Sequence, residues 1–288
     1  MSLIPLPASA AEKVIRLAVA EDAPFGDLTT ESFVPEDARA EAVLSAREPG
    51  VLSGGPVFAK AMQALDAGVV VDLCLREGTR FEPGAELARV TGPARPILTC
   101  ERIALNLVQR MSGVATLTSQ YVAAVHGSGA RIADTRKTTP GLRALERYAV
   151  RCGGGHNHRF GLSDAVLVKD NHLTAVSAAD IGLAEAIRAA REQLPHTVHL
   201  EVEVDRLDQI PAVLDGGADT IMLDNFTLED MRRGVELIAG QAVVEASGGV
   251  SLKTIGAIAD TGVDVISVGA LTHSAPALDL GLDFQVAR

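Results

Sequence analysis

The sequence contains no tryptophan, two tyrosines and seven phenylalanines in 288 residues. Proteins that bind single-stranded nucleic acid by stacking bases on aromatic side chains need more aromatic residues than this. Positive charge is also scarce, because 26 lysine and arginine residues face 37 aspartate and glutamate residues, for a formal net charge of −11. A chain of that charge repels nucleic acid and anionic membrane surfaces. We therefore expect neither as a partner.

Cysteine is rare as well. Cys74, Cys100 and Cys152 are far apart, odd in number and form no CxxC pair, which argues against a disulfide framework. The N-terminal segment has no basic stretch before its apolar residues and does not resemble a secretion signal. No run approaches the roughly 20 apolar residues that a membrane span needs. These absences predict a soluble, cytoplasmic protein.

What the chain does contain is enough apolar sequence for a large core, since hydrophobic residues make up 47% of it. Between residues 40 and 90, short β-rich runs are separated by turn sequences, which indicates a small α+β module. Residues 96–124 have helical spacing and are expected to form two helices.

From residue 131 onward, six short apolar runs alternate with helical segments. The runs are residues 131–134, 165–168, 198–204, 220–223, 243–246 and 265–268. Strands that alternate with helices indicate βα units and a parallel sheet. Six strands are fewer than the eight of a full TIM barrel, and the pattern fits either a smaller barrel or an open doubly wound sheet.

Ionisable or glycine-rich residues follow most of these runs, at the strand ends where α/β proteins bind ligands. Lysine is informative here, because the chain has only five lysines and two of them, Lys137 and Lys169, stand at predicted strand ends. Between residues 131 and 159 there are seven basic and two acidic residues. Arg136, His158 and Arg159 lie in this stretch, and with the lysines they predict a pocket for a small polyanionic ligand.

The remaining arginines of this stretch, Arg143, Arg147 and Arg151, share one face of a helix that we expect Thr139 to cap. We interpret them as a solvated helix face. This leaves the strand-end cations as the candidates for ligand binding.

Two further groups of residues suit a phosphorylated sugar. Glu201 and Asp224 follow neighbouring strands and could hold Mg²⁺ together with a diphosphate, or simply pair with Lys169 or Arg136. Glycine-rich turns, of the kind that bind phosphate through backbone amides, follow the last two strands. Their residues are Ser247, Gly248, Gly249 and Gly269, with His273 shortly after.

The stretch DTRKTTPGLRALERYAVRCGGGHNHRFGLSDAVLVKDNHL resembles the core of the quinolinate phosphoribosyltransferase family. Similarity to the family continues through further ordered blocks over nearly the whole chain, namely EDAPFGDLTT, ERIALNLVQRMSGVAT, LEVEV, IMLDN, EASGGV and ISVGALTHS. Several blocks in order are far more specific than one motif.

The resemblance implies an α/β fold, with an incomplete TIM-like α/β barrel and an N-terminal α+β sandwich domain. The expected domains are residues 1–113 and 114–273, with the tail 274–288 returning to the first. Family members are homodimers with shared active sites, so Arg102 is expected to reach the partner's site.

The implied reaction joins quinolinate to phosphoribosyl pyrophosphate, with Mg²⁺, and yields nicotinate mononucleotide, pyrophosphate and CO₂ in NAD biosynthesis. By resemblance, the two carboxylates of quinolinate are bound by Arg102, Arg136, His158, Arg159 and Lys169. Lys137 lies near the reacting groups, and Glu201 and Asp224 lie near the ribose hydroxyls and Mg²⁺. Ser247, Gly248, Gly249, Gly269 and His273 match the 5′-phosphate end.

Two alternatives remain open. One is a paralogue of the same fold that is associated with molybdenum transport. The other is a carrier protein, because the strands of residues 40–90 resemble a biotinyl or lipoyl half-barrel. The carrier is disfavoured, since no lysine lies between Lys60 and Lys137 to serve as an attachment point.

Overall fold

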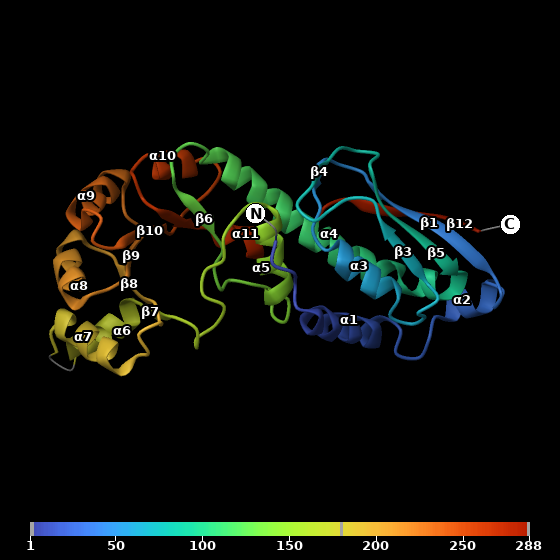
Figure 1. Ribbon diagram of the computed structural model, residues 1–288, viewed down its shortest axis with the longest axis horizontal. Coiled ribbons are helices and arrows are strands. Elements are labelled where there is room, and N and C mark those ends of the chain that lie inside the picture. Colours follow the sequence, from blue (N-terminus) through green and yellow to red (C-terminus); the bar gives the residue numbers. More distant parts are fainter. Residues whose placement is uncertain (1–2, 179–180, 287–288) are drawn as a thin grey trace. The chain divides into compact units, whose positions relative to one another are not determined.

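The computed structural model describes residues 3–178 and 181–286, shown in Figure 1. The chain divides into two compact units. The first comprises the described parts of Met1–Ser119, Thr138–Gly154 and Leu271–Arg288. The second comprises Gln120–Lys137 and Gly155–Ala270. Each unit therefore combines segments that are distant in sequence. Among the described residues, no helix combines the length and the apolar character that crossing a membrane would require.

The first unit is built on a four-stranded antiparallel sheet with the order β12-β1-β5-β3. Its strands are β1 (Arg39–Ala46), β3 (Val70–Leu73), β5 (Glu86–Pro93) and β12 (Leu280–Val286), and β2 (Gly50–Val51) pairs separately with β4 (Arg80–Phe81). Its helices are α1 (Ala8–Asp22), α2 (Leu28–Phe33), α3 (Gly55–Met62) and α5 (Arg143–Cys152). The chain's C-terminal strand thus completes a sheet that begins near residue 39.

One long helix, α4 (Ala94–Ala124), replaces the two helices expected in this region. Ser112 and Gly113 do not interrupt it. Gly113 instead allows close packing, because a Cβ atom at this position would lie 1.9 Å from the carbonyl oxygen of Pro276. The glycine marks a contact with the returning tail and not a helix end.

The prediction that Thr139 caps the basic helix is also wrong. Helix α5 begins at Arg143 and has no side-chain cap. Thr139 donates its N–H and its hydroxyl to the Glu146 carboxylate, at 3.0 and 2.7 Å. Glu146 is fully buried and also accepts from Arg110. The three helix arginines are half-buried, so this helix is packed and is not the solvated face that we expected.

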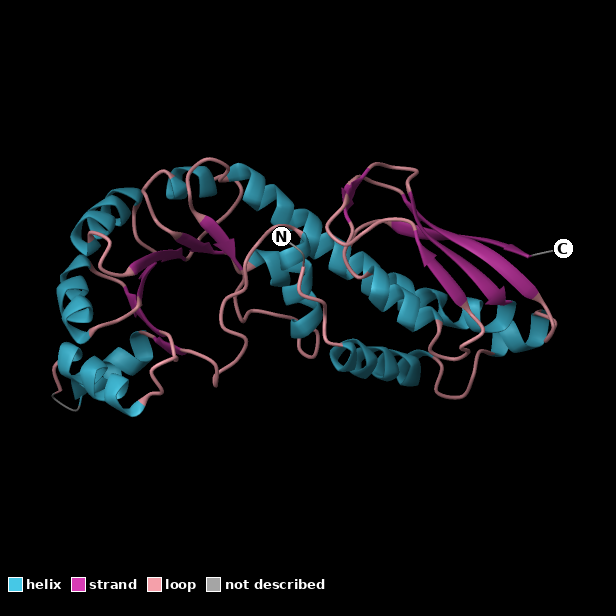
Figure 2. Cartoon of the chain, viewed as in Figure 1, coloured by secondary structure: helices cyan, strands magenta, loops and turns pink. Residues whose placement is uncertain are grey.

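The second unit is the expected parallel α/β domain, and the α/β fold class is confirmed (Figure 2). Its six strands have the order β6-β11-β10-β9-β8-β7, which is open between β6 and β7. The strands are β6 (Arg131–Ala133), β7 (Val166–Val168), β8 (Leu200–Val204), β9 (Thr220–Asp224), β10 (Val243–Ser247) and β11 (Val265–Ser267). All six fall within the predicted apolar runs or within one residue of them.

Helices cover the outer face of this curved sheet and leave its inner face free of helices (Figure 1). They are α6 (Asp170–Ala178), α7 (Leu183–Gln193), α8 (Ile210–Gly216), α9 (Leu228–Ile238) and α10 (Ile255–Ala259), with the short helix η1 (Leu207–Gln209) before α8. The short helix α11 (Ala270–His273) follows β11 and belongs mostly to the first unit. The fully buried residues Leu200, Ile221 and Leu223 belong to the strands.

Candidate active site

Side chains of the parallel strands alternate between the helix-covered face and the inner face, because successive strand residues point to opposite sides. In β9, Thr220, Met222 and Asp224 alternate with the fully buried Ile221 and Leu223. Thr220 lines a lower cavity near the amino ends of the strands, and Met222 and Asp224 line an upper cavity at the carboxyl ends. A step of two residues along β9, from Thr220 to Met222, therefore leads from the lower cavity to the upper one.

The upper cavity has a volume of about 570 Å³ and gathers most of the predicted site. Polar residues and glycines that line it are Thr135, Arg136, Lys137, His158, Arg159, Lys169, Glu203, Asp224, Asn225, Ser247, Gly248, Gly249 and Ser267. These residues come from the ends of all six strands and from the loop after α5. The structure thus brings together nine of the residues singled out from the sequence, which span more than a hundred positions.

The upper cavity concentrates positive charge. Burial and the neighbouring positive charge of Arg136 lower the pKa of the Arg159 guanidinium. Arg159 also donates from Nη1 to the carbonyl oxygen of Ala165 at 3.0 Å. Lys169 Nζ lies 2.8 Å from Glu203 Oε2. Like charges held close together in a partly buried site favour an anionic ligand, which would relieve their repulsion.

A glycine turn closes another side of this cavity. Gly248 has a φ angle of +89°, and a Cβ atom there would lie 2.1 Å from Asn225 Oδ1. The Asn225 N–H donates to the Ser247 carbonyl at 3.0 Å, which joins the turns after β9 and β10. Only glycine fits such a position without strain. The neighbouring Asn225 therefore requires a glycine at position 248, and the turn lines the cavity through Ser247, Gly248 and Gly249.

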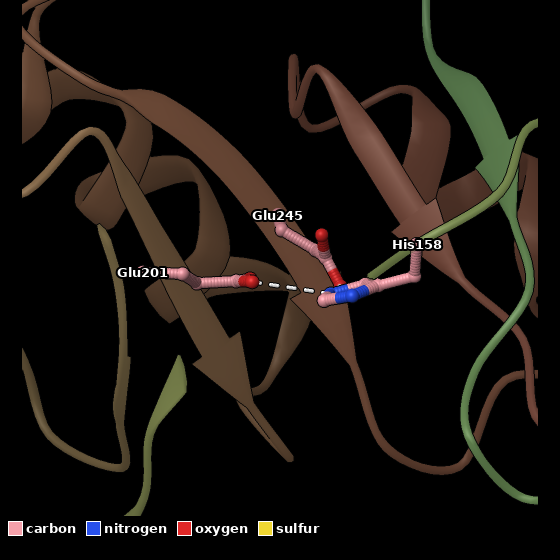
Figure 3. Close-up of side chains that lie close together, drawn as sticks. All are labelled: His158, Glu201 and Glu245. Carbon is pink, nitrogen blue, oxygen red and sulfur yellow. Dashed lines mark ion pairs between the residues drawn. The ribbon is translucent and has the colours of Figure 1, made fainter. Parts of the chain in front are cut away.

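Beneath the upper cavity, His158 contacts two buried carboxylates (Figure 3). Its Nε2 lies 3.1 Å from Glu201 Oε2 and 3.5 Å from Glu245 Oε1. Its Nδ1 accepts the backbone N–H of Arg159 at 2.7 Å. The lower cavity, about 440 Å³ in volume, is lined by Glu201 and Glu245, while His158 and Arg159 line both cavities.

This cluster holds an extra proton. Burial lowers the pKa of His158, but the neighbouring carboxylates of Glu201 and Glu245 outweigh burial and raise it to about 10. Burial also raises the pKa of Glu201. The N–H donated to Nδ1 favours a neutral ring with its proton on Nε2, which would leave the extra proton on a carboxyl group. In both arrangements the Nε2 proton points toward the carboxylates.

Two sets of carboxylates could hold a metal. Glu203 and Asp224 line the upper cavity, where they could bind Mg²⁺ together with substrate phosphates, as that ion prefers. Glu201 does not share this cavity with Asp224, although the sequence pointed to these two as a pair. Glu201 is the inward-facing residue of β8 that precedes Glu203, and it lines the lower cavity. The ligand atoms of Glu201, Glu245 and His158 lie within 4.8 Å of one another and form a second, buried set.

Besides Glu201, three predicted residues lie outside the upper cavity. Arg102 is exposed on α4, and His273, also exposed, bonds to Ser274 through Nδ1; both residues belong to the first unit. Gly269 follows β11 in the second unit but does not line the cavity. The roles proposed for these residues stay predictions.

Three residues of the site had been given no role from the sequence, namely Glu203 and Asn225, which stand at predicted strand ends, and Glu245, which lies inside a predicted strand. Each had a signal in the sequence. Glu203 and Glu245 are acidic residues inside apolar strands, and strand alternation places Glu203 at the level of Met222, its partner on β9. Asn225 has a positive φ angle of 56°, which asparagine tolerates better than most residues.

Comparison with known proteins decides the family. The C-terminal-domain model of quinolinate phosphoribosyl transferase matches residues 114–283, and the N-terminal-domain model matches residues 27–112. The chain belongs to the quinolinate phosphoribosyltransferase family. The sequence resemblance to this family is therefore confirmed.

Individual relatives in this family are similar over nearly their full length. The nicotinate-nucleotide pyrophosphorylase [carboxylating] of Mycobacterium leprae is 45% identical over 283 residues, which cover 95% of this chain and 97% of the relative. A probable enzyme of the same name from Bacillus subtilis is 40% identical, over 93% of this chain and 91% of the relative. The structure of the nicotinate-nucleotide pyrophosphorylase from Francisella tularensis superposes with a TM-score of 0.93 at 37% identity, covering 99% of each chain. These relatives do not support the molybdenum-associated alternative.

Proposed function

We propose that the chain is a carboxylating nicotinate-nucleotide pyrophosphorylase, which joins quinolinate to phosphoribosyl pyrophosphate and releases pyrophosphate and CO₂. Its relatives carry that name. The observation that carries the proposal is the upper cavity, which places Arg136, Lys137, Arg159 and Lys169 beside two carboxylates and a glycine turn. Each part of the two substrates has a chemically matched partner there.

Quinolinate carries two adjacent carboxylates, and the basic side of the cavity suits them. Arg136 and Arg159 present two guanidinium groups that repel each other. Guanidinium groups bind carboxylates through paired hydrogen bonds, so a dicarboxylate replaces this repulsion with attraction. Lys169 would exchange its contact with Glu203 for one with the substrate.

The sugar phosphate suits the opposite side of the cavity. The turn of Ser247, Gly248 and Gly249 would receive the 5′-phosphate on backbone amides. Asp224 and Glu203 would accept hydrogen bonds from the ribose hydroxyls and would hold Mg²⁺. When bound, this ion supplies positive charge that neutralises the diphosphate. Lys137 would lie near the reacting groups and stabilise the departing pyrophosphate.

The reaction needs little acid–base chemistry from the protein. The pyridine nitrogen attacks C1 of the ribose, and the C1–O bond to pyrophosphate breaks with its electron pair on the leaving group. Loss of CO₂ from the carbon next to the positively charged nitrogen then leaves an electron pair that this nitrogen stabilises, and the carbon takes up a proton. Positioning and preorganised charge would supply most of the acceleration.

We further propose a homodimer in which Arg102 serves the partner's site, with His273 and Gly269 near the phosphate end, as the family resemblance suggests. Arg102 is exposed and so accessible to a partner. A cytoplasmic location suits the three cysteines, all of which are free thiols.

The direct test incubates pure protein with quinolinate, phosphoribosyl pyrophosphate and Mg²⁺, and follows nicotinate mononucleotide by chromatography. We expect stoichiometric mononucleotide, pyrophosphate and CO₂, with no product when EDTA removes the metal. Folded protein that forms no mononucleotide under these conditions would exclude the proposed activity.

A further inference from the structure

Two residues of the upper cavity, His158 and Arg159, belong to a segment that is neither helix nor strand. Its backbone is fixed from β6. The buried carboxylate of Asp134, which follows β6, accepts the His158 N–H at 2.7 Å and the Asn157 side-chain amide at 2.6 Å. These contacts set where the segment lies, but they do not set the orientation of the His158 ring.

The ring is oriented from two other strands. Glu201 on β8 and Glu245 on β10 lie on either side of β9, and both face Nε2 of His158 (Figure 3). Nδ1 is occupied by the Arg159 N–H. The His158 side chain is only 13% exposed. Both ring nitrogens are therefore engaged by the protein, and His158 has no N–H left to donate to a ligand in the upper cavity.

Burying these two carboxylates is costly. Their side chains are each 5% exposed, and Glu201 Oε1 and Glu245 Oε1 have no hydrogen-bond partner among the described residues. Apolar residues of similar size would fill the same space beside the lower cavity at a lower cost in free energy. Stability alone does not explain the pair, and buried ionisable groups of this kind concentrate at functional sites.

We propose that Glu201 and Glu245 are positioning residues for the dicarboxylate substrate. They hold His158 by Nε2, His158 holds the Arg159 backbone by Nδ1, and the Arg159 guanidinium is thereby fixed before the substrate arrives. This inference rests on the function proposed above and adds residues that do not touch the substrate. Its physical basis is preorganisation, because a cation that is already held in place loses little conformational freedom on binding.

The test compares Glu245→Gln, Glu201→Gln and Glu245→Asp with wild type. Glutamine keeps the size of the side chain but removes its charge, whereas aspartate keeps the charge. The control is Glu146→Gln, which neutralises an equally buried carboxylate that pairs with Arg110 in the first unit. The measurements are the quinolinate Kd by calorimetry, KM for each substrate, kcat, melting temperature and bound metal by mass spectrometry.

We expect each glutamine variant to raise the quinolinate Kd and KM about tenfold, and the KM for phosphoribosyl pyrophosphate less than about twofold. Glu245→Asp should recover part of the quinolinate affinity. Glu146→Gln should lower the melting temperature and leave the quinolinate Kd unchanged.

Two results would overturn the inference while the proposed function stands. One is a lower melting temperature with an unchanged quinolinate Kd in both glutamine variants. The other is a stoichiometric metal ion that wild type retains and Glu245→Gln loses, because the cluster would then be a metal centre. If one glutamine variant fails to fold, the other and Glu245→Asp decide the question. Wild-type protein that does not bind quinolinate would instead refute the proposed function, and this inference with it.

Discussion

Arg136 and Arg159 illustrate how single residues serve the proposed substrate. Changing either to alanine should lower kcat/KM for quinolinate, because a desolvated substrate carboxylate loses its partner. The loss of transition-state stabilisation should be at least about 2 kcal/mol. Steady-state kinetics at varied quinolinate would measure the effect. The control is Arg232→Ala, on the exposed surface of α9, which should change nothing. An unchanged kcat/KM in either cavity variant would remove that arginine from the dicarboxylate site.

His158 should make stability depend on pH. Its pKa is about 10 in the folded chain against an ordinary value of 6.5, so the folded state binds more protons than the unfolded state between these values. The free energy of unfolding should therefore fall as pH rises from about 6.5 to 10, by at most about 1.4 kcal/mol per pH unit.

The measurement is urea unfolding of wild type and His158→Asn across this pH range. The difference between the two should shrink as pH rises, because asparagine has no proton to lose. Cys100 and Cys152, whose burial raises their pKa values to about 11 and 12, are present in both proteins and cancel in this difference. A difference that is constant with pH would show that the cluster holds no extra proton.

At the scale of the element, Gly113 determines how α4 packs. Alanine is usually the better helix residue by about 1 kcal/mol. Here, however, a Cβ atom would meet the Pro276 carbonyl oxygen at 1.9 Å, and backbone atoms cannot rotate away. We expect Gly113→Ala to destabilise the protein by about 2 kcal/mol or more, as overpacking does.

Thermal unfolding would measure this loss, with Gly256→Ala as the matched control. Gly256 also lies in a helix, but its Cβ atom would have no neighbour closer than 3.9 Å, the Ala124 carbonyl oxygen. That variant should be neutral or slightly more stable. Equal effects of the two changes would show that the tail does not approach α4 as closely as described.

The whole molecule is proposed to function as a dimer with shared sites, and this can be tested by complementation. Arg102→Ala and Lys169→Ala should each be inactive alone. Mixed and allowed to exchange subunits, they should recover about a quarter of wild-type activity, because half of the dimers would then carry one intact site of two. Activity and subunit exchange can be followed together by assay and native mass spectrometry. Confirmed exchange without recovery would argue against a site built from two chains.

The sequence by itself determined the six strands and their alternation with helices, because residue periodicity is a local property of the chain. It also determined that Arg136, Lys137, Lys169 and Asp224 would meet, since parallel strands present their carboxyl ends at one edge. Local sequence was misleading between residues 96 and 124, where two helices were expected and one is present, and packing against the tail accounts for Gly113.

Only the tertiary structure decided which acidic residue stands beside Asp224. Glu201 and Glu203 both face inward from one strand, and the pairing of β8 with β9 places Glu203 beside Met222 and Glu201 beside Thr220, one level lower. Glu245 acquired its contact with His158 in the same way, from residues far apart in sequence. Such relations depend on strand register and on the course of irregular segments, which arise from packing of the whole domain and not from any local pattern.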